Sequence, residues 1–298
     1  MTQTDIYQDI WNTDQQHCGL KAIKKADSTD GLQDHGYVIV DEKEVEDKDH
    51  KVIVEVHIPP SKMESYKLVE TLFNNYVLDQ TKSEVDTIEE HKVEQQEIQS
   101  FIEYVYKTPP MQTAREYYSQ RAKKQVTDDE WWSIIERVWF AQFDSNKNKD
   151  LSGFEHVIVG EQKQGKVQGY HFWYKYYLDE QFVPGALPSS NPPATPPQDT
   201  IHFLGWKGKL NSSPDCVTLS FVWEAFDYKA KKYRKLTKPI GGFWVGLSVE
   251  GLMAIGTVRF LEQAFAPKQT TINDVTYNLV LFRSPNDKHL RTFYPEEI

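Results

Sequence analysis

The sequence predicts an α+β fold in which a helical amino-terminal region precedes two mixed lobes. Three observations lead to this prediction. Apolar residues recur at three- and four-residue spacings between residues 61 and 125, as in helices that bury one face. A Pro- and Ser-rich segment, 184–199, is typical of an exposed linker. After this segment, most apolar runs alternate with a period near two, as in strands.

The predicted domain organisation follows from these changes along the chain of 298 residues. Residues 1–126 form a mainly helical amino-terminal region, and residues 127–298 form a second domain. The second domain consists of two lobes, 127–183 and 200–298, with 184–199 as the linker between them. A chain of this length can bury a core in each part.

The first elements in chain order are one extended run and a set of helices. Residues 1–58 are expected to be loop-rich, with an extended run at 51–58. Helices are expected over 61–125, and Pro109 and Pro110 are expected to end the later one, because proline interrupts a helix.

The later elements begin with a helix whose start is well marked. Thr127 and Glu130 have the spacing of a capping box. Apart from one helix at 250–262, the segments expected after the linker are strands at 201–206, 217–223, 243–247, 276–282 and 290–294.

Cysteine usage and hydropathy limit the class of protein. Cys18 and Cys216 are the two cysteines, so neither a disulfide framework nor a multi-cysteine metal site is expected. No secretory signal is visible at the start of the chain, and the most apolar stretch, 241–258, contains Glu250 and several glycines. A cytoplasmic location without membrane contact is therefore expected.

The charge is unevenly distributed along the chain. The net charge is −10, yet residues 1–128 carry 15 basic and 25 acidic side chains, whereas residues 129–298 carry 19 of each. The second part can therefore present a positive surface, which a nucleic-acid partner requires.

His156 and His171 differ from the other histidines in their surroundings. They flank a polar, glycine-containing turn at 162–169, which favours a hairpin that brings the two segments together. Two imidazoles can serve as general base and general acid because they titrate near neutral pH. Two purely structural histidines are the alternative interpretation of this spacing.

Four segments, in the same order along the chain, resemble the signature of the EndoU family of poly(U)-specific endoribonucleases. The nidoviral uridylate-specific endoribonuclease shares this signature. The four segments are SGFEHVIVGE around His156, GYHFW around His171, KPIGGFWVG from Lys238 and RTFYP from Arg291. The early segment IYQDIWNTD is similar to the start of cellular, eukaryotic-type members. The resemblance spans nearly the whole chain and implies an EndoU-like catalytic domain with antiparallel sheets and flanking helices.

The resemblance implies a uridine-preferring endoribonuclease that cleaves single-stranded or loop RNA. His171 is implied as general base, His156 as general acid and Lys238 as the cation that stabilises the transition state. Glu155 and Glu161 match acidic positions that support activity. The 2′-hydroxyl of RNA attacks the adjacent phosphorus, leaving a 2′,3′-cyclic phosphate and a 5′-hydroxyl. No cofactor is expected for this chemistry, although Mn²⁺ or another divalent cation is expected to stimulate it, and the protein is expected to be a monomer.

The resemblance also assigns a uracil pocket to Thr292 and Tyr294. Gly242 departs from the family pattern, which has serine four residues after the lysine, so a backbone N–H is expected to replace the hydroxyl. Phe172 stands where the family commonly has asparagine.

The run 229–238 holds six basic residues and Tyr233. It is interpreted either as a solvated hairpin loop or as a strip that binds RNA phosphates. The nearby aromatic residues are expected to be mostly core, and these are Tyr170, Phe172, Trp173, Tyr174, Tyr176 and Tyr177.

Three alternatives stay open on the sequence alone. Asp144, Asn146, Asn148 and Glu155 match a calcium-loop pattern, but Lys149 occupies the position that needs glycine. An RNA-binding protein with impaired catalysis is a second alternative. A metal-dependent hydrolase with His156, His171 and Glu161 as metal ligands is a third.

Overall fold

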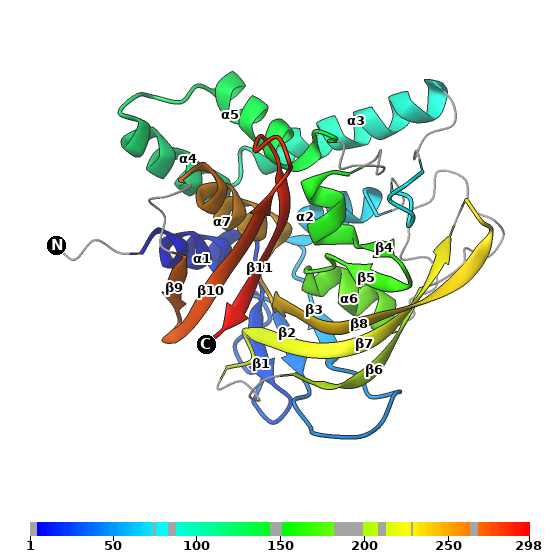
Figure 1. The fold of residues 1–298 in the computed structure, drawn as a ribbon. Coiled ribbons are helices and arrows are strands. Elements are labelled where there is room, and N and C mark those ends of the chain that lie inside the picture. Colours follow the sequence, from blue (N-terminus) through cyan, green and yellow to red (C-terminus); the bar gives the residue numbers. More distant parts are fainter. Residues whose placement is uncertain are drawn as a thin grey trace.

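The computed structural model describes residues 5–73, 76–82, 88–143, 151–181, 199–207, 213–227, 229–262 and 268–298. Helices and mostly antiparallel strands are mixed along this chain, which confirms the predicted α+β class (Figure 1). The helices are α1 (Ile6–His17), α2 (Met63–Thr71), α3 (Ile88–Val105), α4 (Pro109–Ala122), α5 (Asp128–Ile135), α6 (Trp173–Gln181) and α7 (Val249–Leu261). Two short π-helical segments are η1 (Glu136–Phe140) and η2 (Glu155–Val159).

The strands form three sheets. The first contains β1 (Lys21–Lys24), β2 (Tyr37–Val40) and β3 (Ile53–His57). The second has the order β11 (Leu290–Glu297), β10 (Val275–Arg283) and β9 (Gln269–Ile272). The third has the order β4 (Glu161–Lys163), β5 (Lys166–Gln168), β8 (Lys232–Trp244), β7 (Cys216–Asp227) and β6 (Thr200–Trp206).

The five-stranded sheet contains strands from both sides of the predicted linker, since β5 pairs with β8 at Lys166 and Thr237. Residues 184–198 of that linker lie outside the described residues, and the division of the chain into domains stays a prediction. Buried apolar side chains form a shared core that extends from Tyr7 of α1 to Phe293 of β11. Helix α1 contacts both α4 and α7, so the amino-terminal helix packs against elements from the rest of the chain (Figure 1).

The helical prediction for 61–125 is confirmed by α2, α3 and α4. The prediction for the prolines is wrong, because α3 already ends at Val105 and Pro109 begins α4. Proline fits the first turn of a helix, where its missing N–H would have no intrahelical partner. The capping box is confirmed: Thr127 Oγ1 accepts from the Glu130 N–H, and Glu130 accepts from the Thr127 N–H.

Residues 1–58 contain more regular structure than predicted. Besides β3, which confirms the extended run, they hold helix α1 and strands β1 and β2. The buried positions of α1 are Tyr7, Ile10, Trp11 and Asp14. Their spacing is helical, but the acidic residue Asp14 occupies a position where an apolar stripe would have an apolar side chain.

The basic run 229–238 is mostly strand rather than loop, because β8 begins at Lys232. The interpretation as a hairpin loop is therefore confirmed for residues 229–231, which form the turn between β7 and β8, and is wrong for residues 232–238, which lie in β8. Strand β8 also ends at Trp244, before the predicted end at 247. Tyr233, Lys235 and Thr237 are exposed, whereas Leu236 and Lys238 are buried, so exposed residues alternate with buried ones in this part of the strand.

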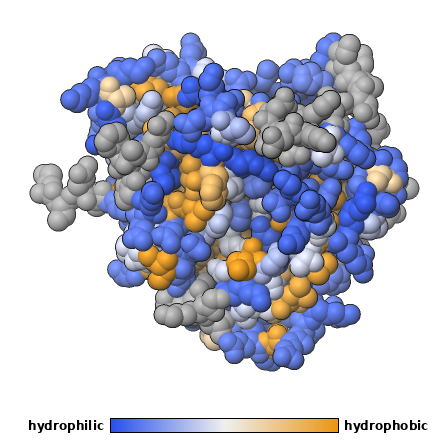
Figure 2. All heavy atoms as spheres, viewed as in Figure 1, coloured by the Kyte–Doolittle hydropathy of each residue, from blue (hydrophilic) through white to orange (hydrophobic). Residues whose placement is uncertain are grey.

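The surface is mixed in polarity. Figure 2 shows apolar side chains in separate groups between hydrophilic residues on the face in view. Of the helices in the described ranges, none has the length and apolar character needed to cross a membrane.

Candidate active site

The β4–β5 hairpin brings the two predicted catalytic histidines together. His156 lies on η2 directly before β4, and His171 follows β5. The returning chain pairs with η2, because the Tyr170 N–H donates to the His156 carbonyl at 2.9 Å. The His171 N–H donates to the Val157 carbonyl at 2.6 Å. The polar, glycine-containing turn in the sequence correctly predicted this return of the chain.

Gly169 permits this close approach. Its φ is +62°, a left-handed conformation that glycine adopts without strain. A Cβ atom at this position would lie 1.6 Å from the His156 carbonyl oxygen, so no larger residue fits. The backbone at Gly169 therefore fixes the spacing between the two histidine-bearing segments.

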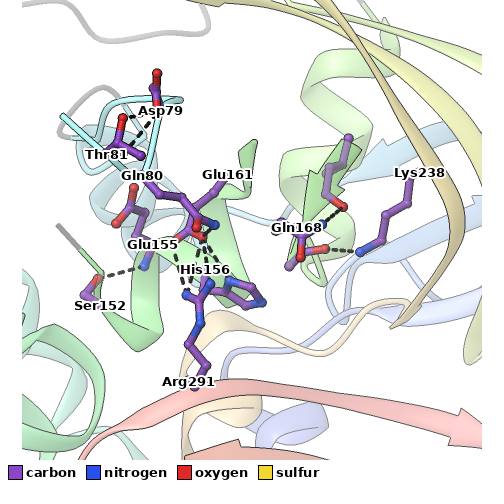
Figure 3. A network of polar contacts seen from close by, with 12 residues as sticks. Asp79, Gln80, Thr81, Ser152, Glu155, His156, Glu161, Gln168, Lys238 and Arg291 are labelled. Carbon is purple, nitrogen blue, oxygen red and sulfur yellow. Dashed lines mark hydrogen bonds and ion pairs between the residues drawn. The ribbon is translucent and has the colours of Figure 1, made fainter. Parts of the chain in front are cut away.

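His156 is held by a buried carboxylate. Its Nδ1 lies 3.1 Å from Oε2 of Glu161, a residue that is fully buried. Arg291 of β11 donates to the same carboxylate at 3.3–3.4 Å, and Gln80 also donates to Oε2. Figure 3 shows Arg291 extending from β11 toward Glu161 and His156. Because Nδ1 contacts the carboxylate, Nε2 is the ring nitrogen of His156 that remains for a different partner.

His171 is held by a neutral partner instead. Its Nδ1 lies 2.9 Å from the carbonyl oxygen of Gly242 on β8. A carbonyl oxygen only accepts hydrogen bonds, so Nδ1 carries the proton and Nε2 of the neutral ring has a free electron pair. The ring also stacks on Tyr294, with centroids 4.4 Å apart and planes inclined by 14°.

Lys238 lies in the same region, on β8. Its Nζ donates to the Gly169 carbonyl at 2.6 Å, beside the turn that joins the two histidines (Figure 3). Burial lowers the pKa of Lys238 to about 8. The lysine therefore stays mostly protonated at neutral pH and places a positive charge beside both histidines.

Burial and neighbouring charges act differently on the two imidazoles. Burial, the Lys238 charge and His156 hold the pKa of His171 well below its usual range, although its hydrogen bond to Gly242 raises it. Burial also lowers the pKa of His156, but Glu161 opposes this effect. Burial alone would raise the pKa of Glu161; His156 and Arg291 reverse this and lower it, so the carboxylate stays ionised.

The residues of the predicted uracil pocket lie on neighbouring strands. Thr292 and Tyr294 are two residues apart on β11, so their side chains share one face of the strand. Thr292 Oγ1 is buried and has no hydrogen-bond partner among the described residues. Pro295, next to Tyr294, places its carbonyl oxygen 3.4 Å from the position that a Cβ atom would take at Gly242.

Gly242 directs its backbone toward this region. It pairs with Thr218 of β7, but its carbonyl accepts from His171 and so points away from β7. In an antiparallel ladder, the N–H and C=O of one residue point to the same side. The Gly242 N–H therefore also faces the side on which His171 lies.

The remaining predicted residues have varied positions. Glu155 is buried on η2, where its N–H donates to Ser152 Oγ at 3.1 Å. Phe172 is buried, as are Tyr170, Trp173, Tyr174 and Tyr176, whereas Tyr177 is half-buried. Asp144, Asn146 and Asn148 of the calcium-loop pattern lie outside the described residues. Within the described ranges, no group of three or more His, Cys, Asp or Glu side chains is arranged to hold a metal ion.

Sequence reasoning gave no role to Arg291 or Gln80. Arg291 begins the RTFYP segment, so its place in a matched segment was a usable signal. Gln80 lies 81 residues before Glu161 in a segment without a recognisable motif, and only the tertiary structure brings the two together.

The chain resembles known proteins both in sequence and in fold. The family model for endoribonuclease XendoU matches residues 3–295. The chain is 26% identical over 302 residues to the poly(U)-specific endoribonuclease of Xenopus tropicalis, covering 97% of this chain and 91% of that protein. It is 27% identical over 243 residues to uridylate-specific endoribonuclease C of Danio rerio, covering 79% of this chain and 69% of that protein.

A solved structure of XendoU, described as a splicing-independent snoRNA-processing endoribonuclease, has the same fold. It matches with a TM-score of 0.65 and 19% identity, and covers 98% of this chain and 96% of that chain. The match to the family model confirms the resemblance found in the four sequence segments. The family model matches nearly the whole chain, so the protein belongs to the XendoU family of endoribonucleases.

Proposed function

We propose that this protein is a uridine-preferring endoribonuclease that cleaves single-stranded or loop RNA through the 2′-hydroxyl. One observation carries the proposal. Beside the buried Lys238, His156 contacts a carboxylate group, whereas His171 contacts a neutral carbonyl group. Family membership and the names of the relatives, poly(U)-specific and uridylate-specific endoribonucleases, support the substrate class.

His171 is suited to be the general base. The Gly242 carbonyl holds its proton on Nδ1, and burial with neighbouring positive charge keeps the ring neutral. Its Nε2 can then take the proton from the 2′-hydroxyl while the 2′-oxygen forms a bond to phosphorus.

His156 is suited to be the general acid. The Glu161 carboxylate stabilises the protonated ring through Nδ1, so Nε2 can carry a second proton. This proton passes to the 5′-oxygen as its bond to phosphorus breaks, giving a 2′,3′-cyclic phosphate and a 5′-hydroxyl.

Lys238 is suited to stabilise the charge that develops on the phosphoryl oxygens. Its ammonium group is a compact charge on a buried side chain of β8, where electrostatic interactions are stronger than in water. His171, His156 and Lys238 would thus supply a base, an acid and a positive charge. This set supports a mechanism in which the chain's own residues transfer the protons and neutralise the charge.

Thr292, Tyr294 and the Gly242 N–H are proposed to read the uracil base. The Thr292 hydroxyl is buried and, among the described residues, unpaired, so a base carbonyl or N–H could satisfy it. Glu155 is proposed to support the segment that carries His156, because both are buried on η2.

We further propose that the protein acts as a cytoplasmic monomer. Cys18 and Cys216 are both buried free thiols, which suits a reducing compartment. No metal is proposed for the bond-making steps, whereas Mn²⁺ or another divalent cation is proposed to stimulate cleavage.

The test uses an RNA oligonucleotide with a single uridine, incubated with and without a chelator. We expect cleavage at the uridine, cyclic-phosphate and 5′-hydroxyl ends, and activity that persists in the chelator. A substrate with 2′-deoxyuridine at the same position is expected to resist cleavage. Cleavage of that substrate, or complete loss of activity in the chelator, would contradict the proposed mechanism.

Variants assign the cleavage to this site. Alanine at His156, His171 or Lys238 is expected to lower the rate by ~100- to 10,000-fold, the usual contribution of such groups. His91→Ala, at an exposed position on α3, is the matched control and should cleave normally. A folded His171→Ala variant with near-normal turnover would exclude His171 as the base.

A further inference from the structure

Glu161 has more hydrogen-bond donors than the orientation of one histidine requires. Its Oε2 is approached by Nδ1 of His156 at 3.1 Å, by Nη2 of Arg291 at 3.3 Å and by the side-chain amide of Gln80. Nη1 of Arg291 lies 3.4 Å from both carboxylate oxygens. One buried carboxylate is therefore shared between a histidine, a guanidinium group and an amide.

These donors come from distant parts of the chain and are held in place by the fold. Gln80 is buried beside the bridge between Asp79 and Gln162, and the Gln162 N–H donates to the Leu78 carbonyl at 2.8 Å. Arg291 begins β11, and four-fifths of its side chain is buried. Glu161 itself begins β4 and is fully buried, so all three groups have little freedom to move.

We propose that Arg291 is a positioning residue that makes His156 a stronger acid by sharing the Glu161 carboxylate with it. This inference rests on the proposed function, in which His156 protonates the leaving oxygen. A carboxylate paired with His156 alone would hold the imidazolium proton tightly. A guanidinium group on the same oxygen neutralises part of that charge and also repels the imidazolium.

The charged groups around His156 act in the directions that this inference needs. Glu161 of β4 raises the pKa of His156, whereas burial lowers it, as do Arg291 of β11 and Lys238 of β8. His171, the other titratable neighbour, has its pKa lowered by His156 in turn. Removing Arg291 should therefore raise the pKa of His156, and removing the charge of Glu161 should lower it. If Arg291 and Glu161 only stabilised the fold, replacing them would not shift the pKa of His156 in opposite directions.

The test follows the imidazole of His156 by NMR in protein labelled at histidine. The signal of His156 is identified by its loss in His156→Ala. We expect Arg291→Met to raise the pKa of His156 relative to wild type, and Glu161→Gln to lower it. Arg121→Met is the matched control, because Arg121 forms an arginine–glutamate pair with Glu262 at 3.0 Å outside the site. This control should leave the pKa of His156 unchanged.

A conservative variant guards against a loss of structure. Arg291→Lys keeps the positive charge without the two-pronged geometry, and is expected to give a smaller shift than Arg291→Met. If His156 titrates as in wild type in folded Arg291→Met and folded Arg291→Lys, the inference is overturned. The same outcome follows if Arg291→Met and Glu161→Gln shift the pKa in the same direction.

Cleavage supplies a second readout. In Arg291→Met, kcat should fall by about 10- to 100-fold, because the acid is weaker and less well oriented. The limb on which activity falls with rising pH should move to higher pH in Arg291→Met and to lower pH in Glu161→Gln. The NMR titration needs no RNA, so it separates the two proposals. If it gives opposite shifts in a protein that cleaves no RNA, the proposed function fails and the role of Arg291 on His156 stands.

Discussion

Lys238 is buried, and burial disfavours the charged form of its side chain. It is 7% exposed, and the single hydrogen bond described for its Nζ is to the Gly169 carbonyl. Since burial lowers its pKa from 10.5 to about 8, keeping the charge in the folded state costs about 3 kcal/mol. A cost in stability of this kind is what the proposed catalytic role of Lys238 predicts.

Lys238→Met should therefore abolish most cleavage and stabilise the fold. Methionine removes the buried charge but also the hydrogen bond to Gly169, so the expected net gain in the free energy of unfolding is about 1–2 kcal/mol. The gain should be full below pH 8, where folded Lys238 is protonated, and should vanish as pH rises from about 8 toward 10.5. Urea unfolding across this range measures it, and a destabilised variant at pH 7 would contradict the argument.

Gly242 is the residue at which the chain departs from its family and at which base choice can be tested. A Cβ atom there would lie 3.3 Å from Thr218 Oγ1 and 3.4 Å from the Pro295 carbonyl, so serine fits with a small adjustment of Thr218. The serine side chain would therefore lie between Thr218 of β7 and Pro295 of β11, the residue that follows Tyr294.

We predict that uridine is preferred over cytidine and that Gly242→Ser strengthens this preference by roughly threefold to tenfold. That range corresponds to one hydrogen bond of ~0.5–1.5 kcal/mol to the base. Cleavage rates on matched substrates with U or C at the cut position give the ratio, and Gly242→Ala controls for the added bulk. An unchanged ratio in Gly242→Ser would show that position 242 does not contact the base.

At the scale of elements, the sequence predicted those features that depend on neighbouring residues. The Thr127–Glu130 capping box and the β4–β5 hairpin each depend on a few consecutive residues, and both are present. Contacts from distant elements were not predictable, because no local pattern encodes them. Gln80 and Arg291 reach Glu161 across 81 and 130 residues, and the stacking of His171 on Tyr294 likewise needs the folded sheets.

The hairpin itself offers two glycines for comparison. Gly165 and Gly169 both have positive φ, +75° and +62°, so alanine would strain the backbone at either position. At Gly165 a Cβ atom would meet nothing within 4 Å, whereas at Gly169 it would meet the His156 carbonyl. Alanine therefore strains the backbone at both positions, but only at Gly169 does its Cβ atom also clash with the His156 carbonyl.

Gly165→Ala is expected to destabilise the protein by about 1 kcal/mol and to leave cleavage nearly normal. Gly169→Ala is expected to destabilise by more than about 3 kcal/mol and to lower cleavage strongly, because His156 and His171 are forced apart. Chemical unfolding and single-turnover cleavage measure both effects. Equal effects of the two substitutions would mean that the close approach at Gly169 is unimportant.

At the scale of the whole molecule, the amino-terminal region is joined to the rest by buried polar contacts as well as by apolar packing. Asp14 of α1 is fully buried and accepts hydrogen bonds from the N–H and hydroxyl of Ser248, which precedes α7. Within the amino-terminal region itself, Lys62 donates to the carbonyls of Gln15 and Gly19. The contact with Ser248 explains why the loop-rich prediction for 1–58 was incomplete: α1 is stabilised by a partner 234 residues away in the chain.

Asp14 gives this junction a pH dependence. Burial raises the pKa of Asp14 from 3.8 to about 7, even though the bonds from Ser248 oppose the shift. A carboxyl group whose pKa is raised by folding contributes stability that is full below about pH 4 and is lost as pH rises to about 7.

Asparagine at position 14 has nearly the same shape as aspartate but does not titrate, and it loses one of the two hydrogen bonds from Ser248. The difference in unfolding free energy between wild type and Asp14→Asn should therefore be largest near pH 4 and shrink by a few kcal/mol toward pH 7. Urea unfolding of both proteins at matched pH values measures this difference. A constant difference across the range would mean that Asp14 does not change its protonation in the folded protein.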